Sequence, residues 1–358
     1  YTILYITINT GGKNMKKIIA LGLSALVACS AAGCSGGNGS SNSSDTFSTA
    51  MVTDTGGVND QSFNQSAWEG LQKFSKETNA KVSYLESTQA TDYETNMDKL
   101  ADQDCNLIWG IGYAMADSLA AAAKRNPNTL YAIADNSYGD QTAENVVGVM
   151  FDAQESAFLV GYIAGKTTKT NSVGFVGGIK SAIIDQFEYG YRAGVDYAAK
   201  ELSKDIKTSV QYVESFSDAS KGKATAKKMF DSGADIVFHA AGGAGTGVIE
   251  AAKDSGKFAI GVDRDQSYLA EDNVLTSALK KVGSAVEIVS KEVLEDKKIG
   301  GTTQTFGLKD DCVGIPENNK NMDPAVYDAA MVIKEKIINK EITPPQTEAD
   351  YKTYVGSL

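Results

Sequence analysis

Short apolar segments alternate with longer amphipathic segments along most of the chain. The apolar runs predict strands at 50–53, 82–85, 107–109, 131–134, 146–150, 173–176, 210–213, 236–238, 258–262 and 274–278. Apolar residues at helical spacing predict helices at 65–79, 114–125, 153–166, 187–203, 222–232 and 246–255. Such repeated strand–helix units favour an α/β fold with parallel sheets that helices cover on both faces.

The strands fall into two similar series, and one strand of each series ends in an aspartate, Asp135 and Asp263. We therefore expect two doubly wound parallel-sheet lobes joined by a hinge. The first lobe is expected to comprise residues 47–152 plus 267–295, and the second residues 153–266 plus 296–358. Ligands bind outside the carboxyl ends of the strands in such sheets, so a cleft between the lobes is the expected binding site.

Residues 15–33 combine two lysines, an apolar run and small residues, a pattern that predicts a lipoprotein signal peptide. The segment Ala31-Ala32-Gly33-Cys34 resembles a lipobox, so Cys34 is expected to carry the lipid, with Cys29 as the alternative. Residues 34–46 then form a flexible tether, and residues 1–14 precede the expected start at Met15. The apolar run is shorter than the ~20 residues of a membrane span. We expect a protein held by lipid on the extracytoplasmic face of the cell membrane.

The formal net charge of -11 argues against nucleic acid as a partner. A single histidine, His239, excludes a two-histidine metal site and disfavours most nucleophile–histidine–acid triads. These counts alone leave open an enzyme that works through carboxylates. Together with the family resemblance given below, they lead us to expect no metal, no cofactor and no enzymatic activity. Beyond the signal, Cys105 and Cys312 have no metal-ligand spacing, and two buried free thiols are favoured over a disulfide between them.

Polar residues gather where the predicted strands end. Asp54, Asp135 and Asp263 each follow a strand, Phe63 lies in the first of these loops, and Lys280 follows the last strand. Any one of the aspartates could be only a helix cap. Several carboxylates converging on one cleft instead suit a neutral polyhydroxylated ligand, whose hydroxyl groups donate to them while a ring covers an apolar face.

The segment 54–70, which reads DTGGVNDQSFNQSAWEG, closely resembles the opening signature of the basic membrane protein family. These are bacterial surface lipoproteins similar to the treponemal purine nucleoside receptor. The resemblance continues through 238–243, 261–266 and 275–280 and covers nearly the whole chain after the tether. It implies a type I periplasmic-binding-protein fold and an ABC importer for nucleosides.

The resemblance also implies roles for single residues. Asp54, Asn59 and Asn64 would lie at the nucleoside, Phe63 would stack on the base, and Asp135 would bind the base edge. Asp263 would accept hydrogen bonds from the ribose, with Lys280 beside it keeping it ionised. The second ring over the base would be Phe187 or His239. Gly243 opens a helix whose free N–H groups can serve a ligand.

The expected partners are a purine nucleoside (guanosine, inosine or adenosine) and an ABC permease, with the protein acting as a monomer. A receptor for a free sugar or a furanose-type signal is the alternative, and a nucleoside hydrolase is a remote one.

Overall fold

Two sheets of six strands form the framework of this computed structural model, which describes residues 46–317 and 320–358. The first sheet is parallel throughout and has the order β11 (Thr302–Phe306), β5 (Val146–Phe151), β4 (Leu130–Ala134), β3 (Leu107–Ile111), β1 (Ser48–Val52) and β2 (Lys81–Leu85). The second has the order β12 (Val313–Gly314), β10 (Val274–Lys280), β9 (Phe258–Asp263), β8 (Ile236–Ala240), β6 (Ser172–Gly177) and β7 (Lys207–Tyr212). Only β12 runs antiparallel among these strands of the described chain.

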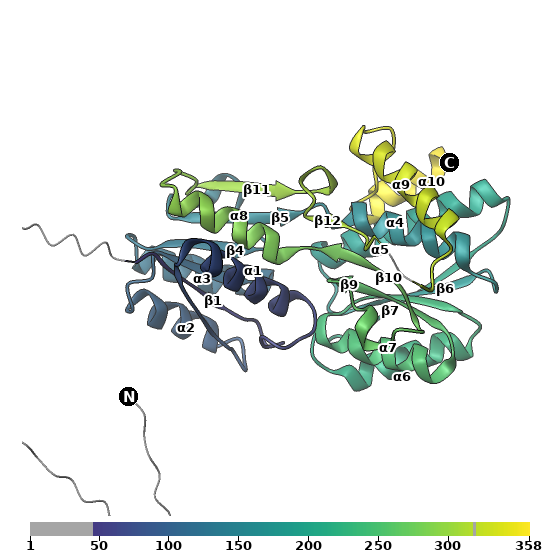
Figure 1. Ribbon diagram of the computed structural model, residues 1–358, viewed down its shortest axis with the longest axis horizontal. Helices are drawn as coiled ribbons and strands as arrows, with labels where there is room; N and C mark the ends of the chain where they lie inside the picture. The colour runs from purple at the N-terminus through teal and green to yellow at the C-terminus, as the bar shows by residue number, and fades with distance from the viewer. Residues whose placement is uncertain (1–45, 318–319) are drawn as a thin grey trace, which may run out of the picture. The chain divides into compact units, whose positions relative to one another are not determined.

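Helices cover both faces of each sheet (Figure 1). In the first lobe α1 (Phe63–Thr78) packs with α8 (Val282–Leu294), and α2 (Asp92–Ala101) packs with α3 (Ala116–Arg125). In the second lobe the packed pairs are α4 (Ala153–Thr167) with α5 (Ala182–Leu202), and α6 (Ala219–Asp231) with α7 (Gly245–Ser255). The C-terminal helices α9 (Pro324–Ile338) and α10 (Glu348–Ser357) pack on α4 and α5. The expected pair of doubly wound α/β lobes is confirmed.

The expected lobe boundaries need one correction. β10 was expected in the first lobe but lies in the second sheet, because it pairs in parallel with β9 after the connection formed by residues 264–273. β11 was expected in the second lobe but forms the edge of the first sheet beside β5. The expected signal peptide at 15–33, the lipid-modified Cys34, the alternative Cys29, the residues 1–14 and nearly all of the tether at 34–46 lie outside the described residues.

Within the described residues the chain crosses between the sheets three times, after β5, after β10 and after β11. Backbone hydrogen bonds join these crossovers to one another: Asp152 N–H donates to Phe306 O at 2.9 Å, and Lys281 N–H donates to Cys312 O at 2.7 Å. Cys312 itself is buried with a free thiol, as is Cys105.

Close helix contacts fix the elements that carry the cleft residues. A Cβ atom on Gly194 of α5 would lie 2.1 Å from the Phe158 carbonyl oxygen of α4, so only glycine lets these two helices approach this closely. A Cβ atom on Gly70 of α1 would lie 2.2 Å from the Gly283 carbonyl oxygen of α8. These contacts hold the first turns of α1 and α5 at the edge of the cleft.

Candidate functional site

A cavity of about 430 Å³ lies between the carboxyl ends of the two sets of strands. It is lined from both lobes, by loops that follow β1, β3 and β4 in the first sheet and by β6, β8, β9, β10 and α5 in the second. Seven of the expected site residues line it: Asp54, Phe63, Asn64, Asp135, Phe187, Asp263 and Lys280. The cleft therefore lies where the strand topology places a ligand site.

The Asp60 carboxylate organises the loop between β1 and α1. Its Oδ1 accepts from the backbone N–H groups of Ser62 at 2.9 Å and Gln65 at 3.1 Å, and its Oδ2 accepts from that of Asn64 at 2.8 Å. These are the N–H groups that the first turn of a helix leaves without partners, and a carboxylate there is further stabilised by the helix dipole. Burial nevertheless raises the pKa of the Asp60 carboxyl.

Asn64 links this cap to the cavity. Its Nδ2 donates to Asp60 Oδ2 at 3.0 Å and to Asp54 Oδ1 at 2.8 Å, while Gly56 N–H also donates to Asp54 Oδ1 at 2.8 Å. Asn64 therefore positions Asp54 and uses its amide donors on carboxylates. Burial raises the pKa of the Asp54 carboxyl to about 6, although the hydrogen bonds from Gly56 and Asn64 lower it.

Two aromatic rings from opposite lobes share one part of the cavity. The Lys280 Nζ lies 4.7 Å from the centre of the Phe63 ring and 5.6 Å from the centre of the Phe187 ring. Both distances are within the range of cation–π attraction. Gly112 keeps the space beside Phe63 open: its φ of +119° suits glycine, and a Cβ atom there would lie 3.6 Å from both Phe63 Cε1 and Asp54 Oδ2.

Lys280 pairs with the carboxylate of the first lobe. Its Nζ lies 2.5 Å from Asp135 Oδ2, and both side chains are at least nine-tenths buried. Asp263 accepts a hydrogen bond from the Ser62 hydroxyl instead. Burial raises the pKa of the Asp263 carboxyl to about 7, although the nearby Lys280 charge lowers it. That Lys280 keeps Asp263 ionised stays a prediction.

Three expected site residues lie off the cavity. The Asn59 side chain is exposed on the β1–α1 loop. Gly243 faces that same loop, since a Cβ atom there would lie 3.6 Å from Asp60 O. His239 is completely buried behind Gln266, whose Oε1 lies 3.0 Å from His239 Nε2, and burial lowers the pKa of His239 to about 4. Of the two candidates for the second ring, the structure thus places Phe187 on the cavity.

The sequence reasoning passed over several lining residues. Tyr113 directly follows the glycine-rich end of β3, and Tyr93 reaches the cavity from α2, a helix that the apolar pattern did not reveal. Ile179, Ile183 and Phe216 form an apolar part of the wall in the second lobe. Two glycines precede Tyr113 and two precede Ile179. These glycines could have pointed to both residues, because glycine at a strand end leaves space for neighbouring side chains to line a cleft.

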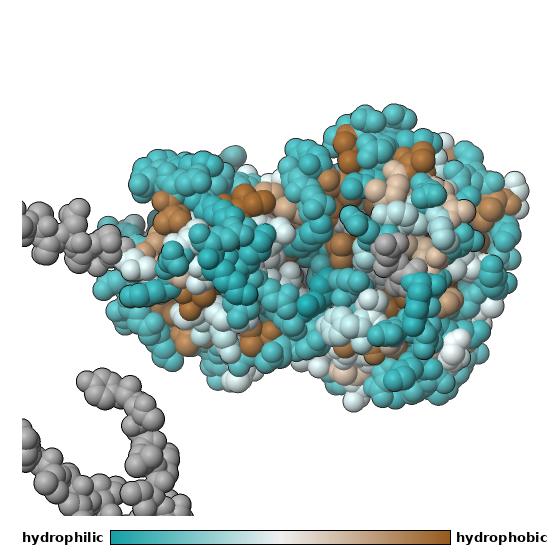
Figure 2. Space-filling model, in the orientation of Figure 1, coloured by the Kyte–Doolittle hydropathy of each residue, from teal (hydrophilic) through white to brown (hydrophobic). Residues whose placement is uncertain are grey.

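The described residues contain no group of three His, Cys, Asp or Glu side chains arranged to hold a metal ion. None of their helices is long and apolar enough to cross a membrane. The face drawn in Figure 2 is mainly hydrophilic, with apolar residues in scattered patches. The cavity offers buried carboxylates and one ammonium to polar groups, and aromatic rings to a planar one.

Comparisons with known proteins agree with this geometry. Residues 47–348 match the family described as ABC transporter substrate-binding protein PnrA-like. The chain is 41% identical to the "ABC transporter nucleoside-binding protein BmpA" of Lactococcus lactis, over 92% of this chain and 99% of that protein. It is 42% identical to "Basic membrane protein A" of Borreliella burgdorferi, over 84% of this chain and 88% of that protein.

A solved structure of an ABC transporter solute-binding protein from Aeropyrum pernix superposes with a TM-score of 0.77 at 26% identity, covering 86% of this chain and 96% of the other. The fold is therefore that of periplasmic-binding-protein-like solute receptors, as expected from the sequence. The resemblance to the basic membrane protein family is confirmed as well. The chain belongs to the PnrA-like family of ABC transporter substrate-binding proteins.

Proposed function

We propose that this protein captures purine nucleosides in the cleft between its lobes and delivers them to an ABC permease. The observation that carries the proposal is that Phe63 and Phe187, from opposite lobes, line one cavity that also holds four carboxylates, Asp54, Asp60, Asp135 and Asp263. A purine presents two apolar faces to such rings, and ribose presents hydroxyl donors to carboxylates. A relative at 41% identity carries the name nucleoside-binding protein.

In this proposal Asp135 recognises the base edge, Asp263 accepts from the ribose hydroxyls, and Lys280 donates within the same site. Asp54, held by Asn64 and Gly56, adds a further acceptor. The protein works as a monomer and is tethered through lipid on Cys34 to the extracytoplasmic face of the cell membrane. It binds without chemistry, in keeping with a family of substrate-binding proteins.

Native mass spectrometry of the protein as purified, followed by calorimetry with inosine, guanosine, adenosine and free ribose, tests this function. We expect a co-purified mass that matches a purine nucleoside and tight binding of at least one nucleoside. Tight binding of ribose without any nucleoside would instead favour a sugar receptor. Release of free base from inosine on incubation would contradict a purely binding role.

A further inference from the structure

One buried side chain ties the ligand-binding loop of the first lobe to the second lobe. The Gln266 Nε2 donates to the Gln61 backbone oxygen at 3.0 Å, and Gln266 is completely buried. Gln61 lies between Asp60 and Ser62 in the loop that delivers Asp54 and Phe63 to the cavity, and its φ is +58°. Neither glutamine lines the cavity.

Bonds within the second lobe decide which way this amide points. The Gln266 Oε1 accepts from Val262 N–H at 2.9 Å and lies 3.0 Å from His239 Nε2. An oxygen can only accept, so His239 carries its proton on Nε2, and Gln266 must turn its NH₂ group toward Gln61. The Gln266 backbone N–H is held in turn by the Ser277 hydroxyl at 3.1 Å.

Two glycines make room for the side chains of His239 and Gln266. A Cβ atom on Gly245 would lie 2.0 Å from the His239 ring, and one on Gly261 would lie 2.7 Å from Gln266 Oε1. His239 Nδ1 has no hydrogen-bond partner among the described residues, so the ring's single bond there is the one to Gln266. The hydrogen bond from His239 therefore fixes the orientation of the Gln266 side chain, and His239 influences the Gln61 loop only through Gln266.

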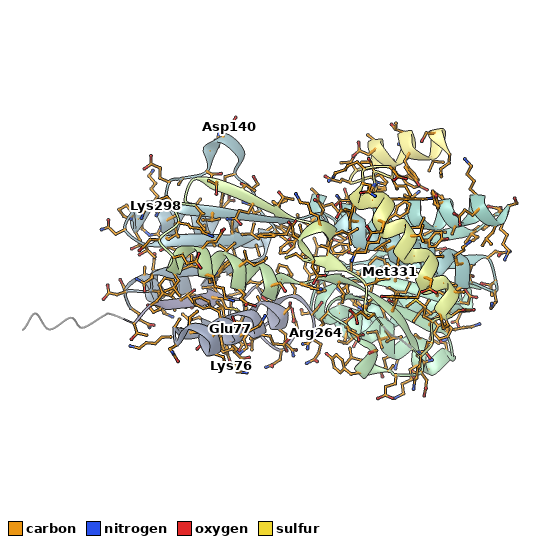
Figure 3. The ribbon with its side chains drawn as sticks, turned by 45° about the horizontal axis from the view of Figure 1, so that its top comes forward. Lys76, Glu77, Asp140, Arg264, Lys298 and Met331 are labelled. Atoms are coloured by element: carbon orange, nitrogen blue, oxygen red, sulfur yellow. The ribbon has the colours of Figure 1, made fainter. Side chains whose placement is uncertain are left out.

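A second buried hydrogen bond joins the same segments, from the Ser62 hydroxyl to Asp263. Two further contacts involve partly exposed side chains. The Tyr268 hydroxyl donates to Gln61 Oε1 at 2.6 Å, and Arg264 lies 3.1 Å from Glu69. Figure 3 shows Arg264 at the outer edge, where the two lobes meet. Exposed contacts of this kind contribute little free energy, whereas a buried bond with fixed geometry is costly to lose.

We propose that His239 and Gln266 form a positioning relay that holds the Gln61 loop against the second lobe and thereby sets how long a ligand stays enclosed. The relay acts on the closed arrangement of the lobes and makes no contact with the ligand. The part of the test that uses inosine rests on the proposed function, while the part that uses unliganded protein does not.

Gln266→Glu is the informative variant. Its carboxylate keeps acceptors for Val262 N–H and His239 Nε2–H but presents an oxygen to the Gln61 carbonyl. At pH 7.5 we expect inosine to dissociate about tenfold faster, with association little changed, from the loss of one buried bond. Toward pH 5 the carboxyl takes up a proton and can donate again, so the defect relative to wild type should shrink. Asp60, Asp263 and His239 titrate nearby in both proteins, and each rate is therefore divided by the wild-type rate at the same pH.

Tyr268→Phe is the matched control, because it removes only the exposed contact to Gln61. It should leave inosine dissociation within about twofold of wild type. A second pair covers the case in which Gln266→Glu fails to fold: His239→Leu removes the donor to Gln266 and should speed dissociation, while His239→Gln restores a donor and should recover most of the wild-type rate.

Small-angle X-ray scattering of the unliganded protein tests the relay without any ligand, because it measures how closely the two lobes are held together. We expect a larger radius of gyration for Gln266→Glu than for wild type at pH 7.5, and convergence of the two near pH 5. The relay would be overturned if Gln266→Glu and wild type had the same radius of gyration at both pH values. It would also be overturned if the faster dissociation from Gln266→Glu did not change with pH. If wild type fails to bind inosine while the scattering difference is present, the ligand assignment fails and the relay stands.

Discussion

Asp135 and Asp263 occupy equivalent positions in the two sheets and share the same unusual backbone conformation. Asp135 directly follows β4 and Asp263 ends β9, each in the third place of its sheet order, and φ is +64° at both residues. Left-handed backbone is uncommon outside glycine, and aspartate is among the residues that tolerate it best. The shared geometry turns each carboxylate into the cavity from its own side.

Replacing Phe63 by alanine should weaken nucleoside binding by roughly 1–3 kcal/mol, the value of one base–aromatic stack. Calorimetry with inosine measures the loss. Trp68→Ala is the control, because Trp68 lies on the same helix but does not line the cavity. A folded Phe63→Ala protein with unchanged affinity would remove this ring from the site.

The preference for ribose over deoxyribose should depend on Asp263 and on pH. Hydroxyl groups donate best to an ionised carboxylate, and the pKa of Asp263 is about 7 in the unliganded protein. Inosine affinity should therefore increase as the pH rises from 5 to 8, and 2′-deoxyinosine should bind about tenfold more weakly at pH 8. Asp263→Asn keeps the side chain's shape and tolerates the left-handed backbone. It should abolish the preference for ribose and reduce the pH dependence, of which Asp54 retains a part because its pKa is about 6. Titrations that show the preference for ribose intact would contradict this role.

Ionisation of the buried Asp54 carboxyl should lower the free energy of unfolding of the unliganded protein as the pH rises. Its pKa is about 6 in the folded protein and near 3.8 in the unfolded chain, so the folded state holds the proton more tightly. The stability that this group contributes is fully present below pH 3.8 and is lost as the pH rises through 6. The free energy of unfolding of Asp54→Asn, relative to wild type, should therefore increase between pH 4 and pH 7. Urea unfolding at several pH values measures this difference, and a flat difference would contradict the burial of a costly carboxylate.

Nucleoside monophosphates should bind much more weakly than nucleosides. The cavity gathers Asp54, Asp135 and Asp263 and offers one ammonium, Lys280, which already pairs with Asp135. A dianionic phosphate near these carboxylates meets repulsion that a buried setting screens poorly. Competition of guanosine and its monophosphate for the same protein decides the point, and comparable affinities would refute the claim.

Membrane attachment should depend on Cys34. Cys34→Ser should release the protein into the medium or leave it unprocessed, whereas Cys29→Ser should leave attachment unchanged. Fractionation of cells followed by immunoblotting distinguishes the two. Release by Cys29→Ser alone would move the lipid to that residue.

The apolar pattern predicted the central strands well because both faces of these strands are covered. β3 and β8 are completely buried, and β3 and residues 236–238 of β8 read as continuous apolar runs. β11, with the sequence Thr-Thr-Gln-Thr-Phe, is largely exposed at a sheet edge and carries no such signal. The helix α2 was hidden for a similar reason, because its polar residues outnumber the few that face the core.

The sequence predicted those site residues that stand at the ends of strands, but not the contacts that form between the two lobes. Aspartates at the ends of β4 and β9 are visible in the sequence, and both line the cavity. The choice of Asp135 rather than Asp263 as the partner of Lys280 depends on how the lobes meet, which no local pattern encodes. The same holds for Gln266, whose role comes from a residue 205 positions away.

The first lobe is completed by α8 and β11, which follow β10 of the second lobe in the sequence. This order limits how the protein can be assembled during synthesis. α8 covers α1, and β11 closes the edge beside β5, yet both come after nearly every strand of the second sheet. A nascent chain that ends at residue 280 would have made β10 and still leave the Gly70 face of α1 uncovered. The first lobe is therefore begun first and completed only once residues 282–306 are present, so synthesis from the N-terminus cannot finish the lobes one at a time.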